Sequence, residues 1–171
     1  FADLQLGRDA PKIILAGGVG SHEQVRHWLG EGADGIQVGT AFAVTEECDA
    51  HENFKRVLID AEPEQLLEFT SVAGLPARAV GTPWLTRYLK QEETLQANTR
   101  NDPRRCSQRM DCLTQCGLRD GIAKFGQFCI DLKLAAAMRG EVSRGLFFRG
   151  ASKLPFGNKN VNSDLLGDAY E

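Results

Sequence analysis

Two short apolar runs near the start of the chain end in residues suited to holding an anion. Residues 12–16 lead into Gly17-Gly18, and residues 35–38 lead into Gly39-Thr40. Glycine lets backbone N–H groups approach an anion with no Cβ in the way, and threonine can add a hydroxyl. Either pair alone is compatible with a tight turn between a strand and a helix. Together the two pairs predict a phosphate-binding site.

The segment between the two runs predicts the element that positions them. Ser21 and Gln24 form a capping-box pair at the start of a helix, and Gly30 and Gly32 end that helix. The apolar residues on one face of this helix are Val25, Trp28 and Leu29. Because strand, helix and strand follow closely, we expect two parallel strands buried on both faces, with their carboxyl ends at one edge.

The rest of the chain predicts a mostly helical second part. Helices are expected over residues 51–61 and from Pro83 onward, and residues 66–80 fit a hairpin or an extended excursion. Polar residues 96–105 predict a loop. An amphipathic helix is expected to run from Ile122 to about Arg139, and the tail from residue 145 shows little periodicity.

Three stretches resemble a known family. The segment PKIILAGGVG…GADGIQVGTAF around Pro11 to Thr40, GLPARAV at 74–80 and GLFFRGAS at 145–152 are similar to the C-terminal half of the nitronate monooxygenases, once called 2-nitropropane dioxygenases. The resemblance implies an α/β fold: the C-terminal part of an FMN-binding TIM (β/α)₈ barrel, with a smaller, mostly helical domain. We expect residues 1–62 to hold the last two βα units with the phosphate turns, residues 63–144 to form an added hairpin and helical domain, and residues 145–171 to be a tail packing back on the barrel.

The resemblance also implies a cofactor and a reaction. Gly18, Gly39 and Thr40 would bind the phosphate of FMN, with Gly17 shaping its turn and Gln37 near the cofactor. The implied enzyme is an FMN-dependent oxidoreductase that oxidises alkyl nitronates with O₂. Two alternatives stay open: a flavin-dependent enoyl-acyl-carrier-protein reductase, which uses a nicotinamide donor, and a non-catalytic half-barrel fragment or phosphate-binding module.

The chain departs from the family in what precedes these strands. A whole barrel takes eight βα units in roughly 250 residues, whereas two are recognisable here. The histidine usually assigned as the family's catalytic base has no counterpart, and His22, His27 and His51 are expected at the surface. We therefore name no catalytic residue and expect the base to lie outside this chain. Because the sequence opens on Phe1 and not Met, we expect a piece of a longer protein.

Four cysteines cluster in the second half of the sequence: Cys106, Cys112, Cys116 and Cys129. The spacing of Cys112 and Cys116 fits half a metal site, but the whole set matches no common zinc or iron–sulfur framework. We expect free or packing thiols and no metal, with a metal site or redox pairing as alternatives.

Further side chains have a structural and a functional interpretation. An arginine cluster, formed by Arg100, Arg104, Arg105 and Arg109, predicts a solvated face or a site for an anionic substrate or pyridine nucleotide. Arg78 fits a salt bridge within a hairpin or a position near the active site. Trp84, Phe147 and Phe148 are expected in a core or domain interface and not against a flavin.

Composition narrows the classes of partner. The net charge of −3 argues against nucleic acid, and the apolar runs are far shorter than the ~20 residues of a membrane helix. The odd number of five cysteines favours reduced thiols and a cytoplasmic protein. A small-molecule substrate is the expected partner. Two strands without neighbours would leave apolar edges, so the chain alone is expected to aggregate or form a homodimer.

Overall fold

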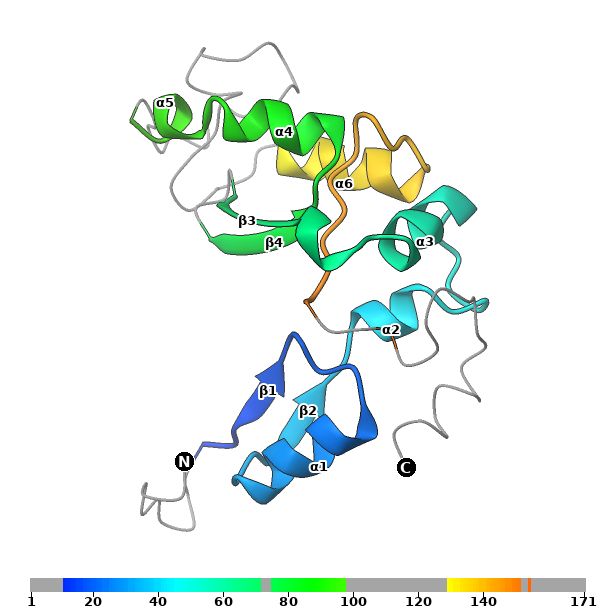
Figure 1. Cartoon of the computed structure of the whole chain (residues 1–171), viewed down its shortest axis with the longest axis vertical. Coiled ribbons are helices and arrows are strands. Elements are labelled where there is room, and N and C mark those ends of the chain that lie inside the picture. The colour runs from blue at the N-terminus through cyan, green and yellow to red at the C-terminus, as the bar shows by residue number, and fades with distance from the viewer. Residues whose placement is uncertain (1–10, 72–74, 98–128, 152–153, 155–171) are drawn as a thin grey trace. The chain divides into compact units, whose positions relative to one another are not determined.

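The chain forms two compact units, each with its own two-stranded sheet. The computed structural model describes residues 11–71, 75–97, 129–151 and 154. The first unit holds the residues up to Asp49 and from Gly150 onward, and the second holds residues 50–149 (Figure 1).

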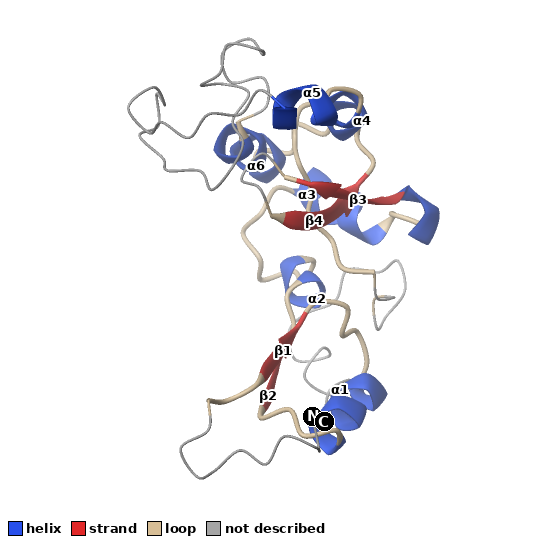
Figure 2. Cartoon of the chain, turned by 90° about the vertical axis from the view of Figure 1, so that its left-hand side faces the viewer, coloured by secondary structure: helices blue, strands red, loops and turns tan. Residues whose placement is uncertain are grey.

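In the first unit, a helix connects two parallel strands that pair with each other. Strand β1 (Ile14–Ala16) pairs with β2 (Gly35–Gln37), so that Ile14 lies opposite Gly35 (Figure 2). Helix α1 (His22–Gly30) connects them, and the short helix α2 (Thr40–Ala43) follows β2. The Asp34 carboxylate accepts a 2.9 Å hydrogen bond from the Ile13 N–H, and the Asp34 N–H donates to the Ile13 carbonyl at 2.8 Å. The predicted strand–helix–strand unit is therefore confirmed.

The start of α1 is fixed by the predicted capping pair. The Ser21 hydroxyl oxygen accepts a 3.3 Å hydrogen bond from the Gln24 N–H. The Gln24 side-chain oxygen accepts in turn from the Gly20 N–H at 2.8 Å. Beyond the helix, Gly32 has a φ of +99°, a left-handed conformation that glycine adopts without strain.

One expectation about this unit is wrong in the described structure. The two strands were predicted to be buried on both faces, yet Ile14 is 58% exposed, and α1 has no buried residue. The physical reason is the size of the sheet. Among the described residues it has two strands, whereas a parallel strand is buried on both faces within a wider sheet that helices cover on each side.

The second unit is built on an antiparallel hairpin. Strands β3 (Leu66–Thr70) and β4 (Pro76–Val80) pair in register from Leu66 opposite Val80 to Thr70 opposite Pro76, which confirms the hairpin interpretation. Arg78 forms an ion pair with Glu68 directly across the hairpin, as one of its two interpretations predicted.

Helices precede and follow this hairpin in the chain. They are α3 (Glu52–Ile59), the 3₁₀ helix η1 (Pro63–Gln65), α4 (Pro83–Leu89), α5 (Glu92–Ala97) and α6 (Ile130–Met138). The predicted helices at 51–61 and from Pro83 are thus present. The predicted helix from Ile122 appears as α6; its residues 122–128 lie outside the described part, and Cys129 caps the helix start instead of lying within it.

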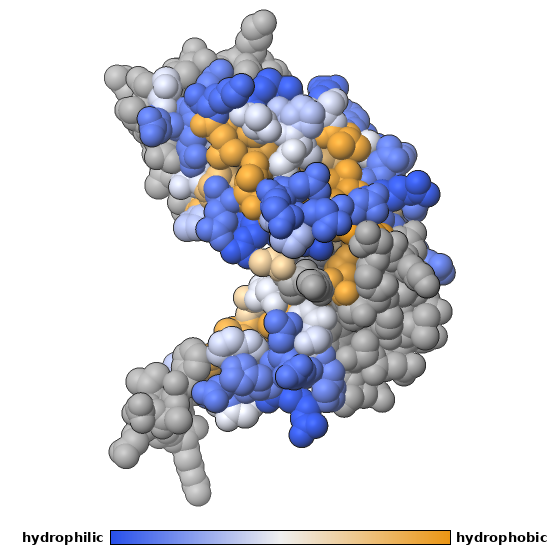
Figure 3. All heavy atoms as spheres, viewed as in Figure 1, coloured by the Kyte–Doolittle hydropathy of each residue, from blue (hydrophilic) through white to orange (hydrophobic). Residues whose placement is uncertain are grey.

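The core of the second unit lies between the hairpin and α4. Its buried members are Phe69, Ala79, Trp84, Leu85, Tyr88 and Leu146. Thr82 caps α4 by accepting from the Leu85 N–H and donates its own hydroxyl to the Gly145 carbonyl. Figure 3 shows apolar side chains of this unit in strips between hydrophilic ones.

Segment 145–149 packs against the hairpin of this unit. The Val80 N–H donates to the Phe147 carbonyl at 2.9 Å, and Phe147 is fully buried. Trp84 and Phe147 are therefore core residues, as predicted. Phe148 is 37% exposed, and its ring stacks on that of the buried Phe69 at the edge of the core.

The compact units divide the chain after Asp49 and before Gly150, and the predicted segments 1–62, 63–144 and 145–171 stay a prediction. Helix α3 belongs to the second unit because its ends are tied there. The His51 N–H bonds to the Met138 carbonyl, and the Arg149 guanidinium donates to the Leu58 carbonyl at 2.7 Å. These contacts join residues distant in the sequence, which composition and periodicity do not reveal.

Among the described residues, no helix has the length and apolar character needed to cross a bilayer.

Candidate functional site

The carboxyl ends of β1 and β2 meet at a small pocket in the first unit. Its lining comes from the first strand end (Ala16, Gly17, Gly18, Val19), the second strand end (Gln37, Gly39, Thr40) and Gly150. Parallel strands end at the same edge of a sheet, which is why two turns far apart in sequence share one cavity. All five residues predicted for the site lie in this lining.

The pocket is shaped mainly by backbone. Gly17 and Gly18 have φ values of +81° and +74°, so this turn needs two consecutive left-handed residues. A Cβ built on Gly17, Gly18 or Gly39 would meet no atom within 4 Å. The space is therefore open beside each of these glycines, and a side chain there would occupy it.

Gly39 differs from the other two glycines. Its φ is −112°, within the range of any residue, so the pocket requires glycine here for space and not for conformation. Gly39 directly precedes α2, whose first backbone N–H groups have no acceptor within the helix. The turn therefore presents N–H donors beside the pocket.

Gly150 adds a wall that the predicted site did not include. Its N–H donates a 3.2 Å hydrogen bond to the Thr40 hydroxyl oxygen. Because that bond uses an oxygen lone pair, the hydroxyl hydrogen stays available to donate to a ligand. A Cβ at residue 150 would come within 3.3 Å of the Gly18 nitrogen, so the chain passes close to the first turn. Within the sequence, the signal for this residue was the stretch GLFFRGAS.

The size and charge of the pocket favour a small anionic group. Its volume is about 160 Å³, below the roughly 300 Å³ at which pockets for whole ligands begin. No side chain in its described lining carries a charge. An anion here would be held by N–H and hydroxyl donors, as at many phosphate sites.

The other candidate residues lie elsewhere. None of the three histidines lines this pocket: His27 and His51 are exposed, as predicted, and His22 is half-buried at the start of α1. His51 caps α3 by accepting from the Asn53 N–H at 3.0 Å.

The cysteine and arginine clusters fall largely outside the described residues. Cys129 is buried, whereas Cys106, Cys112 and Cys116 and the four arginines at 100, 104, 105 and 109 lie beyond the described ranges. Across the residues that are described, no group of three His, Cys, Asp or Glu side chains is arranged to hold a metal ion.

The sequence is similar to one known protein family and to two curated proteins. The family model for nitronate monooxygenase matches residues 8–153. A protein of Saccharomyces cerevisiae is 30% identical over 79 residues, which are 46% of this chain and 19% of that protein. One of Bacillus subtilis is 33% identical over 73 residues, 43% of this chain and 21% of the relative. The curated names of both give nitronate monooxygenase as an inferred activity. The matched segments thus span about a fifth of each relative's length.

Solved structures share the fold. FabK from Thermotoga maritima superposes with a TM-score of 0.65 at 20% identity, covering 94% of this chain and 43% of that one. Nitroalkane oxidase from Streptomyces ansochromogenes gives 0.59 at 21% identity, covering 93% and 38%. Since the family model covers more than half of the sequence, the chain belongs to the nitronate monooxygenase family.

Proposed function

We propose that this chain carries the FMN-phosphate site of a flavin-dependent oxidoreductase that oxidises alkyl nitronates with O₂. The observation that supports it most directly is the convergence of Gly17-Gly18, Gly39-Thr40 and Gly150 on one uncharged pocket. Family membership implies a flavin, and the pocket residues have the chemistry that a phosphate requires.

The fit to phosphate rests on donors and space. Open volume beside Gly17, Gly18 and Gly39 accommodates phosphate oxygens where side chains would otherwise stand. The N–H groups at the start of α2 and the Thr40 hydroxyl donate to those oxygens. Gly150 orients the hydroxyl by donating to its lone pair. Gln37, exposed at the end of β2, lines the same pocket and would contact a part of the cofactor next to the phosphate.

Bound there, FMN would supply the electron-accepting ring for the substrate and for O₂. This chain's part is to hold the phosphate and thereby set the position of that ring. We assign the two βα units of the first unit to the C-terminal part of a TIM barrel, in which the loops after the last two strands commonly bind phosphate. The general base and the remaining walls would come from sequence outside this chain.

FMN and riboflavin distinguish a phosphate site from general flavin binding. Riboflavin lacks the phosphate and therefore the charge-assisted hydrogen bonds that the phosphate makes. The 171-residue chain should bind FMN about tenfold more tightly than riboflavin. Gly39→Val should fill the pocket and reduce FMN affinity to that of riboflavin. Thr40→Ala should cost less, about 1 kcal/mol. Flavin fluorescence quenching measures each affinity.

Gly30→Val is the matched control for Gly39→Val. Both glycines have open space for a Cβ and neither has a positive φ, but Gly30 lies outside the pocket. The Gly30→Val variant should bind FMN with the affinity of the unaltered chain. Equal affinity for FMN and riboflavin in the unaltered chain, or undiminished FMN binding by a folded Gly39→Val variant, would contradict the phosphate assignment.

The reaction needs its own test. Oxygen consumption with an alkyl nitronate would support the proposed activity, whereas oxidation of a nicotinamide donor with an enoyl thioester would favour the enoyl-acyl-carrier-protein reductase. FMN binding without either turnover in the protein that contains the complete barrel would favour the non-catalytic module.

A further inference from the structure

The core-facing side of α6 carries a lysine. Lys133 is only 7% exposed and shares this face with the buried Ala136 and Ala137. Its ammonium makes no hydrogen bond or ion pair with any other described residue. Burying an ammonium without a partner is costly because the charge loses its hydration. An apolar side chain would fill this position at a lower cost in folding free energy than lysine does.

The turn that follows α6 gathers further cations around this lysine. The Leu146 N–H donates to the Lys133 carbonyl at 3.1 Å, which fixes the turn against the helix. Arg87, from α4, donates to the Ser143 carbonyl in the same turn at 3.3 Å. Arg144 is the next residue along. Two helices and the turn thus bring three cationic residues together, and the charges of Arg87 and Arg144 act on the Lys133 ammonium.

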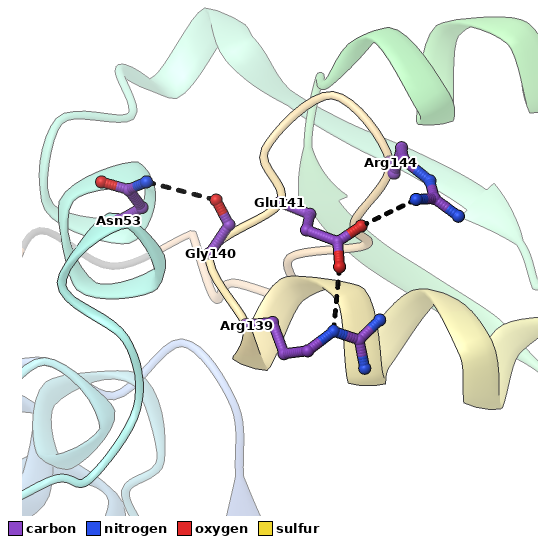
Figure 4. A network of polar contacts seen from close by, with 5 residues as sticks. All are labelled: Asn53, Arg139, Gly140, Glu141 and Arg144. Carbon is purple, nitrogen blue, oxygen red and sulfur yellow. Dashed lines mark hydrogen bonds and ion pairs between the residues drawn. The ribbon is translucent and has the colours of Figure 1, made fainter.

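One carboxylate partly balances this charge. Glu141 accepts from the Arg139 Nε at 2.8 Å and pairs with the Arg144 Nη1 at 3.1 Å (Figure 4). The hydrogen bond from Arg139 holds the pKa of the Glu141 carboxyl below its usual range, so this residue is ionised at neutral pH. Its single negative charge lies near three cations: Lys133, Arg139 and Arg144.

The local electrostatics are consistent with an excess of positive charge. Burial lowers the pKa of the Lys133 ammonium, and the charges of Arg144 and Arg87 lower it further. Cys129 and Glu141 act in the opposite direction without cancelling that shift. An added anion would relieve both the repulsion and the desolvation.

We propose that Lys133, Arg87 and Arg144 form a binding site for the phosphate group of a small molecule, on the turn between α6 and residue 146. Arginine can present two parallel N–H donors to phosphate oxygens, and lysine adds a compact charge. This site belongs to the unit of residues 50–149, whereas the glycine pocket belongs to the other unit. Neither assignment depends on the other.

Titration of the 171-residue chain with inorganic pyrophosphate at constant ionic strength tests the site, in an Ile14→Lys background that is chosen to limit self-association through β1. Backbone amide NMR signals of residues 143–146 should shift saturably, and signals of Gly17, Gly18 and Thr40 report separately on the glycine pocket. Lys133→Met keeps an apolar stem without the charge and should weaken binding at 143–146 by about tenfold or more. Lys12→Met removes an exposed lysine of the first unit and should leave pyrophosphate binding at residues 143–146 unchanged.

Two further variants keep the test decisive if Lys133→Met folds poorly. Arg144→Gln changes a side chain that is 68% exposed and should also weaken pyrophosphate binding. Glu141→Gln should strengthen it, because the competing carboxylate charge is removed while the size is kept. Adenosine diphosphate is the second probe. Tighter binding of adenosine diphosphate than of pyrophosphate would indicate a nucleotide site, and equal binding would indicate that the site recognises the phosphate groups alone.

Stability gives an independent readout. Without ligand, Lys133→Met should unfold at a higher temperature because a buried charge with no partner among the described residues is gone. Pyrophosphate should raise the midpoint of the unaltered chain and not that of Lys133→Met. The proposal is overturned if residues 143–146 show no saturable shift, or if Lys133→Met lowers the midpoint and leaves binding unchanged.

Discussion

Gly18 and Gly39 line one pocket but are glycines for different reasons. Gly18 has a φ of +74°, whereas Gly39 has −112°. Gly18→Ala should therefore destabilise the first unit by about 1 kcal/mol even without ligand, because alanine is strained at this φ. Gly39→Ala should leave stability unchanged. Urea unfolding followed by Trp28 fluorescence, in a Trp84→Phe background, measures the first unit alone; equal stability of the two variants would contradict this distinction.

At the scale of elements, Asp34 joins the entry to β1 with the entry to β2. Hydrogen bonds from the Lys12 ammonium and the Ile13 N–H hold the pKa of its carboxyl below the usual value of about 3.9. Its stabilising contribution is therefore complete above that value and is lost as pH falls through the lowered folded pKa. Asp34→Asn should reduce the loss of stability of the first unit at acid pH, measured by Trp28 fluorescence. Asp60→Asn, at the C-cap of α3, should leave that pH dependence unchanged.

For the whole molecule, the exposed apolar side chain on β1 of the first unit predicts self-association. Ile14 on β1 is 58% exposed, and the matched segments span about a fifth of each curated relative. An open parallel edge recruits another strand, so the isolated chain should dimerise or aggregate with rising concentration. Ile14→Lys should suppress this in sedimentation velocity. Leu75→Lys, at a residue 53% exposed in the other unit, should not. A monodisperse monomer of the unaltered chain at high concentration would count against open edges.

Local patterns in the sequence were sufficient for the elements of the first unit and for its glycine turns. The pairing of Ser21 with Gln24, the run before Gly17 and the run before Gly39 are all short-range signals, because capping and strand patterning involve residues a few positions apart. Parallel strands end at one edge, so the same patterns also placed the five predicted residues at one pocket.

Tertiary structure alone decided the contacts between residues far apart in the sequence. The Gly150 N–H meets the Thr40 hydroxyl across 110 positions, and the Arg149 guanidinium reaches the Leu58 carbonyl across 91. The burial of Lys133 and the exposure of Ile14 likewise depend on what packs against each element. Periodicity identifies which face of a helix or strand is apolar, but only the neighbouring elements determine whether that face is covered and which polar groups meet.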